Sequence, residues 1–144
     1  MYRRIDNEHE IKEVVCNSLG TDLDLIVHRH HCKAGSVQGC VDYTISTLYN
    51  DEEEIEFYEL YDEDSPYGFI AVNKQMNMLR SFMINSDKRD KKHFRWFKNN
   101  VKDIMHGQCL APIWKDNDRA AKFLSRIGEE ILRNDEIIIY KICQ

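Results

Sequence analysis

The stretch Asn117-Asp118-Arg119-Ala120-Ala121-Lys122-Phe123-Leu124-Ser125-Arg126-Ile127-Gly128 carries more information on the fold than any other part of this chain of 144 residues. Asn117 or Asp116 can cap a helix, and Gly128 is typical of a helix end. The apolar segment 109–114 before it and the apolar segment 136–142 after it both have the length and composition of strands. The pattern predicts a helix over 117–128 that lies between two strands.

The rest of the chain adds strands and helices in a mixed order. Short turns at 62–66 and 73–75 separate three β-rich segments, which indicates an antiparallel meander. Apolar residues at helical spacing predict a long amphipathic helix over 91–106. The expected elements are a strand at 2–5, a helix at 7–20, a helix within 36–49, strands at 54–61, 67–73 and 78–84, a helix at 91–106, a strand at 109–114, a helix at 117–128, and a hairpin of 130–132 with 136–142. This order, β-α-α-β-β-β-α-β-α-β-β, predicts one α+β domain over 1–144, with a mixed central sheet covered by helices.

The composition is that of an ordinary globular domain, with 42% apolar and 31% charged residues. The longest apolar runs have the length of a strand, so no membrane span is expected. The first six residues lack the apolar core of a secretory signal, and we expect the protein to be cytoplasmic when it is made. Five cysteines without a CxxC pair favour reduced, mostly buried thiols over a disulfide framework.

The charges are separated along the chain, although the net charge is only −5. Residues 51–64 contain nine acids and no base, whereas residues 88–102 contain seven bases and a single acid, Asp90. These segments are either solvated surfaces or contact patches for different partners. The basic helix carries Trp96 and Phe97, but Phe97 belongs to the apolar stripe, so nucleic acid is not the expected partner.

Several local features resemble the GNAT acyltransferase superfamily over nearly the whole chain. They are the strand 78–84 that leads into the helix 91–106, the spacing of Asn117, Ala120, Phe123 and Gly128, and the apolar closing hairpin. The resemblance implies the GNAT fold, a mixed sheet with helices on its faces. For an active member it also implies transfer of an acyl group from acyl-CoA to an amine.

Two positions depart from the pattern of active GNAT enzymes. Those enzymes hold the pyrophosphate of acyl-CoA with backbone N–H groups of a glycine-containing loop, but the loop 85–92 has no glycine here. Asp87 and Asp90 in this loop would repel phosphate. The family's usual general acid, a tyrosine seven residues after the asparagine, corresponds to Leu124, which cannot donate a proton.

These departures lead to the first hypothesis, a GNAT-fold protein without catalysis and without a cofactor. The glycine-free loop, the segment 94–97 and the segments 122–124 and 127–128 resemble GNAT-like proteins of tailed phages, including an internal or assembly protein of the virion. That resemblance implies other proteins as partners, virion components among them, and a place inside a phage particle. We expect no metal and no membrane contact.

The alternative hypothesis is an N-acetyltransferase in which an amine attacks the thioester of acetyl-CoA directly. The basic side chains of the loop would then hold the phosphates, the backbone of 79–84 would orient the thioester, and Glu56 or Glu59 would accept the proton. The expected cofactor-binding residues are Lys88, Arg89, Lys91, Lys92 and Asn117. This hypothesis requires the strands 78–84 and 109–114 to diverge, and Met83 or Trp114 packed between them would exclude it.

Two other constellations carry weaker signals. His28, His30 and Cys32 would project together from a strand, with Cys40 eight residues later, but no second paired cluster completes a zinc pattern. Cys109 or Cys32 could pair with a histidine as a nucleophile, yet nothing in the sequence brings such a pair together. A buried thiol is the expected state.

Overall fold

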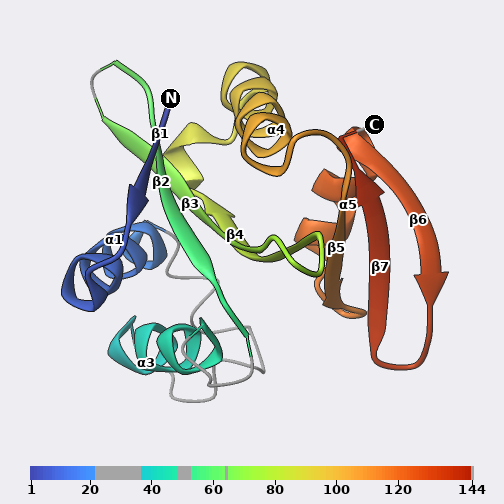
Figure 1. The fold of residues 1–144 in the computed structure, drawn as a ribbon, viewed down its shortest axis with the longest axis horizontal. Coiled ribbons are helices and arrows are strands. Elements are labelled where there is room, and N and C mark those ends of the chain that lie inside the picture. The colour runs from blue at the N-terminus through green and yellow to red at the C-terminus, as the bar shows by residue number, and fades with distance from the viewer. Residues whose placement is uncertain (22–36, 49–52, 64, 144) are drawn as a thin grey trace.

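The computed structural model describes residues 1–21, 37–48, 53–63 and 65–143, shown as a coloured ribbon in Figure 1. The elements follow the order expected from the sequence, with a short 3-10 helix added before α4. They are β1 (Tyr2–Ile5), α1 (Glu8–Gly20), α3 (Val37–Leu48), β2 (Glu56–Tyr61), β3 (Pro66–Asn73), β4 (Met78–Ile84), η1 (Ser86–Lys88), α4 (Lys91–Met105), β5 (Cys109–Trp114), α5 (Asp118–Ile127), β6 (Gly128–Arg133) and β7 (Ile137–Ile142). The predicted α+β class is confirmed.

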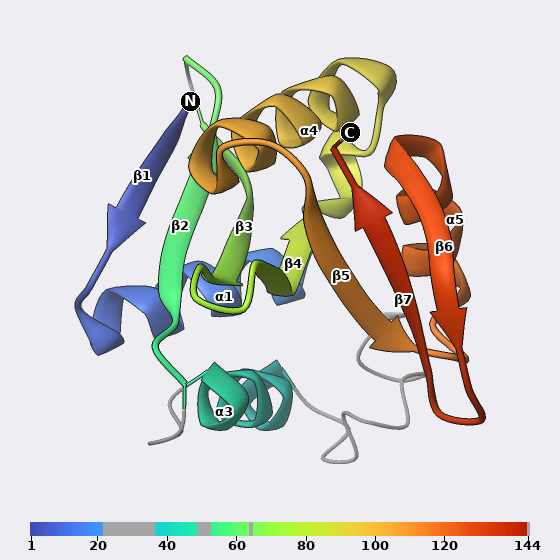
Figure 2. The same cartoon turned by 45° about the vertical axis from the view of Figure 1, so that its right-hand side comes forward.

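All seven strands form one sheet in the order β1-β2-β3-β4-β5-β7-β6. Neighbouring strands are antiparallel except β4 and β5, which are parallel. Short turns join β2 to β3, β3 to β4 and β6 to β7, whereas the parallel pair β4 and β5 needs the crossover through α4. Figure 2 shows this crossover above the sheet.

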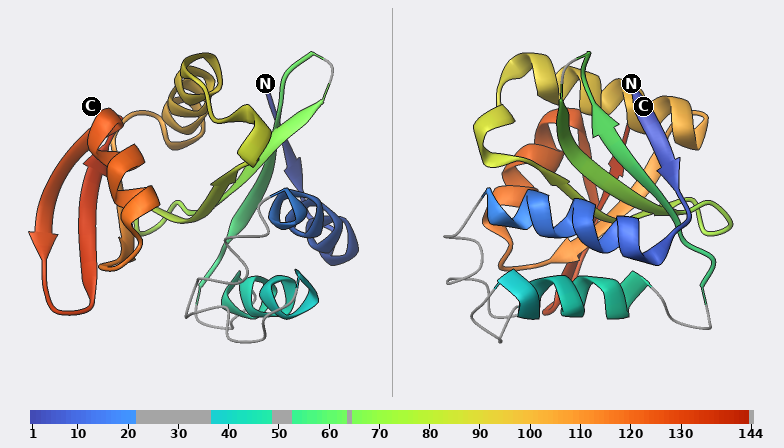
Figure 3. Two further views of the ribbon diagram at one scale, coloured as in Figure 1. Left: turned by 180° about the vertical axis from the view of Figure 1, so that it is seen from behind. Right: turned by 90° about the vertical axis from the view of Figure 1, so that its left-hand side faces the viewer.

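Two hydrophobic cores lie on opposite faces of the sheet. The first contains Phe97 of α4 and Leu124 of α5, both fully buried, so these two helices cover the same face. The second contains Val15 of α1 and Ile45 of α3, together with Met83 of β4. The right-hand view of Figure 3 shows α1 and α3 in front of the sheet and α4 behind it. Alternation of side chains along the strands directs successive residues to the two cores.

Asparagine side chains cap the N-termini of α1 and α5. The Asn7 carboxamide oxygen accepts a hydrogen bond from the Glu10 amide (3.1 Å), and the Asn117 oxygen accepts one from the Ala120 amide (3.2 Å). Such caps satisfy amides that have no partner within the first turn. Within the described part of the chain, no helix has the length and apolar character needed to cross a membrane.

Candidate functional site

Strands β4 and β5 diverge after a single paired position. Met78 is opposite Leu110, and the Leu110 amide donates to the Asn77 carbonyl at 2.9 Å. Beyond this point no further β4–β5 pair occurs among the described residues, and Figure 1 shows the two halves of the sheet leaning apart. The divergence required by the acyltransferase hypothesis is therefore present.

A β-bulge in β4 accompanies the divergence. Val72 of β3 is opposite Leu79 and Ala71 is opposite Ser81, so Arg80 is the extra residue. A bulge increases the local twist of a strand and bends it away from its regular path. The bulge lies two residues after Met78, where β4 separates from β5.

The backbone of Phe82 is directed toward the side of β4 on which β5 lies. The Asn85 amide donates to the Tyr67 carbonyl at 2.8 Å, and Phe69 is opposite Met83 in the same register. Because hydrogen-bonding residues alternate along an antiparallel ladder, Met83 uses its backbone groups on β3, whereas Phe82 and Ile84 direct theirs away from it. The diverging edge of β4 thus presents backbone donors and acceptors that β3 does not use.

Four phenylalanines join this edge to the helices on the first core. The Phe82 ring lies 5.6 Å from that of Phe97 on α4 and 6.0 Å from that of Phe123 on α5, measured between centroids. Phe94 and Phe123 are 5.0 Å apart. Tilted aromatic pairs at these separations are favourable beyond their buried area. The cluster fixes α4 and α5 relative to the diverging edge.

The basic loop meets the same edge of β4. The Arg89 Nε atom donates to the Ile84 carbonyl at 2.9 Å. Ser86 is tied to the end of α1 because its amide donates to the Thr21 Oγ1 atom (3.1 Å) and its hydroxyl donates to the Thr21 carbonyl. The predicted basic residues therefore lie beside the divergence on a loop anchored at both ends.

The predicted basic side chains differ in their surroundings. Arg89, Lys91 and Lys92 are exposed, and Lys88 is half-buried in η1. The Lys92 ammonium lies over the Trp96 ring, 4.9 Å from its centroid, in a cation–π contact. Cationic groups of this kind attract phosphate without the preformed backbone cradle of a glycine loop.

A carboxylate of the chain itself occupies the N-terminus of α4. Asp90 Oδ1 accepts from the His93 amide at 2.9 Å and lies 2.8 Å from His93 Nδ1. The hydrogen bond from the His93 amide is the main reason that the pKa of Asp90 is lowered, and the His93 ring adds to it. A helix N-terminus binds anions, so this carboxylate competes for the position that a phosphate would take.

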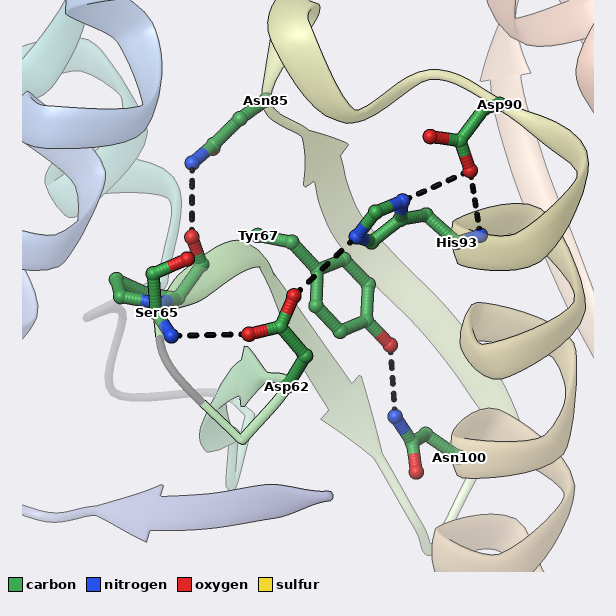
Figure 4. A network of polar contacts seen from close by, with 8 residues as sticks. Asp62, Ser65, Tyr67, Asn85, Asp90, His93 and Asn100 are labelled. Atoms are coloured by element: carbon green, nitrogen blue, oxygen red, sulfur yellow. Dashed lines mark hydrogen bonds and ion pairs between the residues drawn. The ribbon is translucent and has the colours of Figure 1, made fainter.

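His93 links α4 to the β2–β3 turn, as Figure 4 shows. The ring is 3% exposed, and its second nitrogen, Nε2, lies 3.5 Å from Asp62 Oδ2. The Tyr67 ring packs against the imidazole at a tilt of 59°, with 5.1 Å between centroids, and the Tyr67 hydroxyl accepts from Asn100 Nδ2 at 2.8 Å. Burial raises the pKa of Tyr67 to about 12, so this phenol stays protonated. The network was missed from the sequence because Asp62 and His93 are 31 residues apart.

Leu124 is fully buried in the first core, where it packs as an ordinary apolar residue of α5. Its side chain has no group that can donate a proton, as the sequence indicated. Asn117, predicted to bind cofactor, caps α5 and is half-buried. As the cap, Asn117 lies at the start of the helix that carries Leu124.

Glu56 and Glu59 lie on β2, which β3 separates from β4. Glu56 forms ion pairs with Arg4 (2.8 Å) and Lys74 (3.1 Å), and Glu59 forms one with Arg3 at 3.1 Å. The structure does not bring either carboxylate onto the diverging strand. Their assignment as the base stays a prediction.

Met83 or Trp114 packed between β4 and β5 would have excluded acetyl transfer, but both side chains lie elsewhere. Met83 belongs to the second core, beneath α1 and α3, and Trp114 is 46% exposed at the end of β5.

The thiol of Cys109 is 1% exposed, and burial raises its pKa to about 12, which argues against a nucleophile there. His28, His30 and Cys32, which the sequence offers only as an incomplete zinc pattern, lie outside the described residues. Elsewhere in the chain, the described part holds no group of three His, Cys, Asp or Glu side chains suited to a metal ion.

Comparison with solved structures identifies the fold as that of GNAT acetyltransferases. An acetyltransferase from Thermus thermophilus matches with a TM-score of 0.70 and 11% identity, over 98% of this chain and 96% of that one. The PaiA N-acetyltransferase from Thermoplasma acidophilum, solved with coenzyme A, matches with a TM-score of 0.63 and 14% identity over 100% and 98% of the two chains. No family model and no curated protein matches the sequence. At these identities the similarity establishes the fold.

The expectation that the protein has no cofactor is corrected by these matches. The PaiA structure contains coenzyme A, and a Campylobacter jejuni N-acetyltransferase, PseH, that matches with a TM-score of 0.56 and 9% identity over 100% and 99% of the two chains was solved with acetyl coenzyme A. The expectation rested on the glycine-free loop and Leu124. The loop nevertheless places basic side chains beside a diverging strand edge.

Proposed function

We propose that this protein is an acyl-CoA-dependent N-acetyltransferase that acts on an amine. The observation that carries the proposal is the divergence of β4 from β5 after Met78 and Leu110, with the backbone of Phe82 directed away from β3. A strand edge of this kind can pair with the amide groups of a pantetheine arm, much as it would pair with a neighbouring strand.

The residues present fit acetyl-CoA with one exception. Lys88, Arg89, Lys91 and Lys92 supply positive charge for the phosphates, and the Phe82 backbone supplies hydrogen bonds for the arm. The exception is Asp90, whose carboxylate occupies the helix N-terminus and weakens phosphate binding there. We therefore expect the affinity for acetyl-CoA to be lower than a glycine-loop cradle would give.

The acetyl group arrives on a thioester, and the amine nitrogen forms a bond to its carbonyl carbon while the carbon–sulfur bond breaks. The sulfur leaves as a thiolate and takes up a proton, and the amine loses one. An ordinary thiol has a pKa near 8.5, so the thiolate is a workable leaving group near neutral pH without an acid. With Leu124 at the usual position of the acid, we expect a rate lower by about 10² to 10⁴ than general acid catalysis would give.

In this mechanism, the protein contributes to the rate by binding the thioester and the amine and orienting them toward each other. Holding the two reactants together can replace much of the entropic cost of a bimolecular reaction. The proposed base, Glu56 or Glu59, would act on a proton that reaches β2 through solvent, because β3 lies between β2 and the diverging strand. Replacement of either glutamate by glutamine tests that role separately.

The test of the function is product formation from acetyl-CoA and a panel of primary amines, ranging from polyamines to the N-termini of peptides. We expect equal amounts of free coenzyme A and N-acetylated amine. A correctly folded protein that releases no coenzyme A with any amine, and shows no heat of binding with acetyl-CoA, would overturn the proposal.

A second candidate is a GNAT-fold protein that acts through protein contacts without catalysis, including the virion role implied by the phage resemblance. Two observations favour it, the burial of Leu124 and the carboxylate of Asp90 at the N-terminus of α4. A correctly folded protein that shows no heat of binding with acetyl-CoA in the test above would support this candidate. Micromolar binding of acetyl-CoA would defeat it.

A further inference from the structure

Positive charge is concentrated in the part of the chain that forms η1, α4 and α5. Residues 86–126 contain eleven Lys and Arg against five Asp, whereas the remaining residues contain nine Lys and Arg against twenty Asp and Glu. A protein with a net charge of −5 therefore carries a strongly basic segment. Such local fields steer oppositely charged partners even when the total charge has the opposite sign.

The basic side chains form a strip along two helices. On α4, residues 91, 95, 98 and 102 recur at spacings of four, three and four, which places them on one helical face. On α5, residues 119, 122 and 126 do the same. All are exposed except the half-buried Lys98. We call these residues the basic strip: Lys91, Arg95, Lys98, Lys102, Arg119, Lys122 and Arg126.

The two halves of the strip are neighbours, and the acids of α4 are turned away from it. Phe94 of α4 contacts Phe123 of α5, with 5.0 Å between ring centroids. Asp90 is directed to His93, and Asp103 accepts a hydrogen bond from the Tyr2 hydroxyl on β1. The strip therefore keeps its positive character along the whole length of α4.

The strip borders the proposed site for the thioester. Arg89 connects the start of α4 to the Ile84 carbonyl on the diverging edge, and the Phe123 ring of α5 lies 6.0 Å from that of Phe82. A partner bound on the strip would therefore sit next to the divergence.

The strip extends further than free acetyl-CoA requires. Lys102 lies in the last turn of α4, at the end of the helix away from the loop that would hold the diphosphate. At the near end Asp90 already occupies the helix N-terminus, which suits a single phosphate held by side chains better than a diphosphate held by backbone amides. The distribution of the basic side chains therefore fits a ligand that has a single phosphate attached to a large acidic protein.

We propose that the basic strip docks an acidic carrier protein whose phosphopantetheine arm delivers the acyl group along β4. This inference rests on the proposed function and identifies its preferred donor. The amine nitrogen bonds to the acyl carbon and the carbon–sulfur bond breaks. The carrier's sulfur leaves as a thiolate and takes up a proton, while the amine loses one, so no oxidant or further reactant is needed.

A nucleic acid fits the strip less well than an acidic protein. Single strands are held by aromatic platforms interleaved with bases. On α4, the Trp96 ring packs against His93 and Tyr67, and the Lys92 ammonium lies over it. The neighbouring Phe94 and Phe97 rings are engaged with Phe123.

The test compares three donors with the full chain: an acetylated acyl carrier protein, acetyl-CoA and acetyl-pantetheine. The strip variant is Arg95→Glu/Lys102→Glu, and the matched control is Lys12→Glu/Arg133→Glu, which makes the same change of charge on α1 and β6. Binding of the unacylated holo carrier protein is measured by calorimetry, in addition to transfer to an amine.

We expect the strip variant to weaken carrier binding and to raise the KM for the acetylated carrier by more than about tenfold, because several cations face one acidic surface. The control variant should leave both unchanged, and acetyl-pantetheine should be used equally by all three proteins. Higher salt should weaken binding of the carrier more than use of acetyl-pantetheine.

The outcomes separate the two proposals. No transfer from any donor would overturn the proposed function. Transfer from acetyl-CoA and acetyl-pantetheine without binding of the carrier, or equal losses in the strip and control variants, would overturn the inference alone. Salt-dependent binding of a single-stranded oligonucleotide, lost in the strip variant, together with no binding of the carrier, would also overturn it.

Discussion

Asp90 Oδ1 lies 2.8 Å from the Nδ1 atom of His93 and 2.9 Å from its amide nitrogen. One carboxylate therefore caps α4 and holds the buried imidazole at the same time. In a loop without a glycine, the chain itself thus supplies the anion that stabilises the helix start. The same carboxylate is the main obstacle to phosphate binding at the N-terminus of α4.

The first prediction concerns this carboxylate and the cofactor. Asp90→Ser keeps a capping oxygen but removes the negative charge, so the dissociation constant for acetyl-CoA should fall by about three- to tenfold. Isothermal titration calorimetry measures the change. Asp103→Asn is the matched control, because it removes one charge at the other end of α4. Unchanged or weaker binding by a folded Asp90→Ser protein would show that the carboxylate does not compete with phosphate.

The second prediction concerns acid stability. The pKa of Asp90 is lower in the folded protein than in the unfolded chain, mainly because of the His93 amide. Its stabilisation is therefore complete above the ordinary carboxyl pKa and is lost as the pH falls through the lowered value. The difference in Tm between the native protein and Asp90→Asn should be largest near neutral pH and shrink below about pH 4. A difference that is constant with pH, or that grows in acid, would contradict this account.

The third prediction concerns Leu124 as a core residue. The side chain is 0% exposed, and Leu124→Ala should lower the free energy of unfolding by about 2–5 kcal/mol. Leu132→Ala is the control, because that leucine is 48% exposed on β6 and its loss should change stability by no more than about 0.5 kcal/mol. Chemical denaturation measures both. Similar effects of the two substitutions would place Leu124 outside the core.

The fourth prediction concerns the close approach of β3 to β4. A Cβ atom added at Gly68 would lie 2.1 Å from the Met83 carbonyl oxygen, a backbone atom that cannot move without shifting the strand. Gly68→Ala should destabilise the fold by about 1–3 kcal/mol. At Gly20 an added Cβ meets nothing within 4 Å, so Gly20→Ala should be neutral or stabilising by up to about 1 kcal/mol. Thermal unfolding that ranks the two in the opposite order would refute the β3–β4 register.

The sequence predicted the elements where local pattern and tertiary environment agree. The strands 78–84 and 109–114 have the same bounds in the structure, because apolar runs there are bounded by turn residues. The strand expected over 130–132 is longer, from Gly128 to Arg133. Its residues lie at the edge of the sheet and are mostly exposed, so they lack the apolar alternation that reveals a half-buried strand.

The candidate site was predictable only in its composition. The basic loop and Leu124 are visible in the sequence. The structure places the loop beside the diverging edge of β4 and buries Leu124 in the first core. The direction of the Phe82 backbone depends on the register with β3, which no local pattern encodes. The contact between Asp62 and His93 joins two segments far apart in the chain, so the turn containing Asp62 gave no sign of its role.

The fifth prediction tests the central claim, that the edge of β4 at Phe82 binds a pantetheine thioester. Phe82→Pro and Phe82→Ala both remove the ring, but only proline removes the amide that points away from β3. The measurement is the dissociation constant of acetyl-CoA for the two variants, with circular dichroism to confirm the fold. We predict that Phe82→Pro binds about five- to a hundredfold more weakly than Phe82→Ala, the cost of one unmade hydrogen bond. Equal affinity of two folded variants would contradict the account.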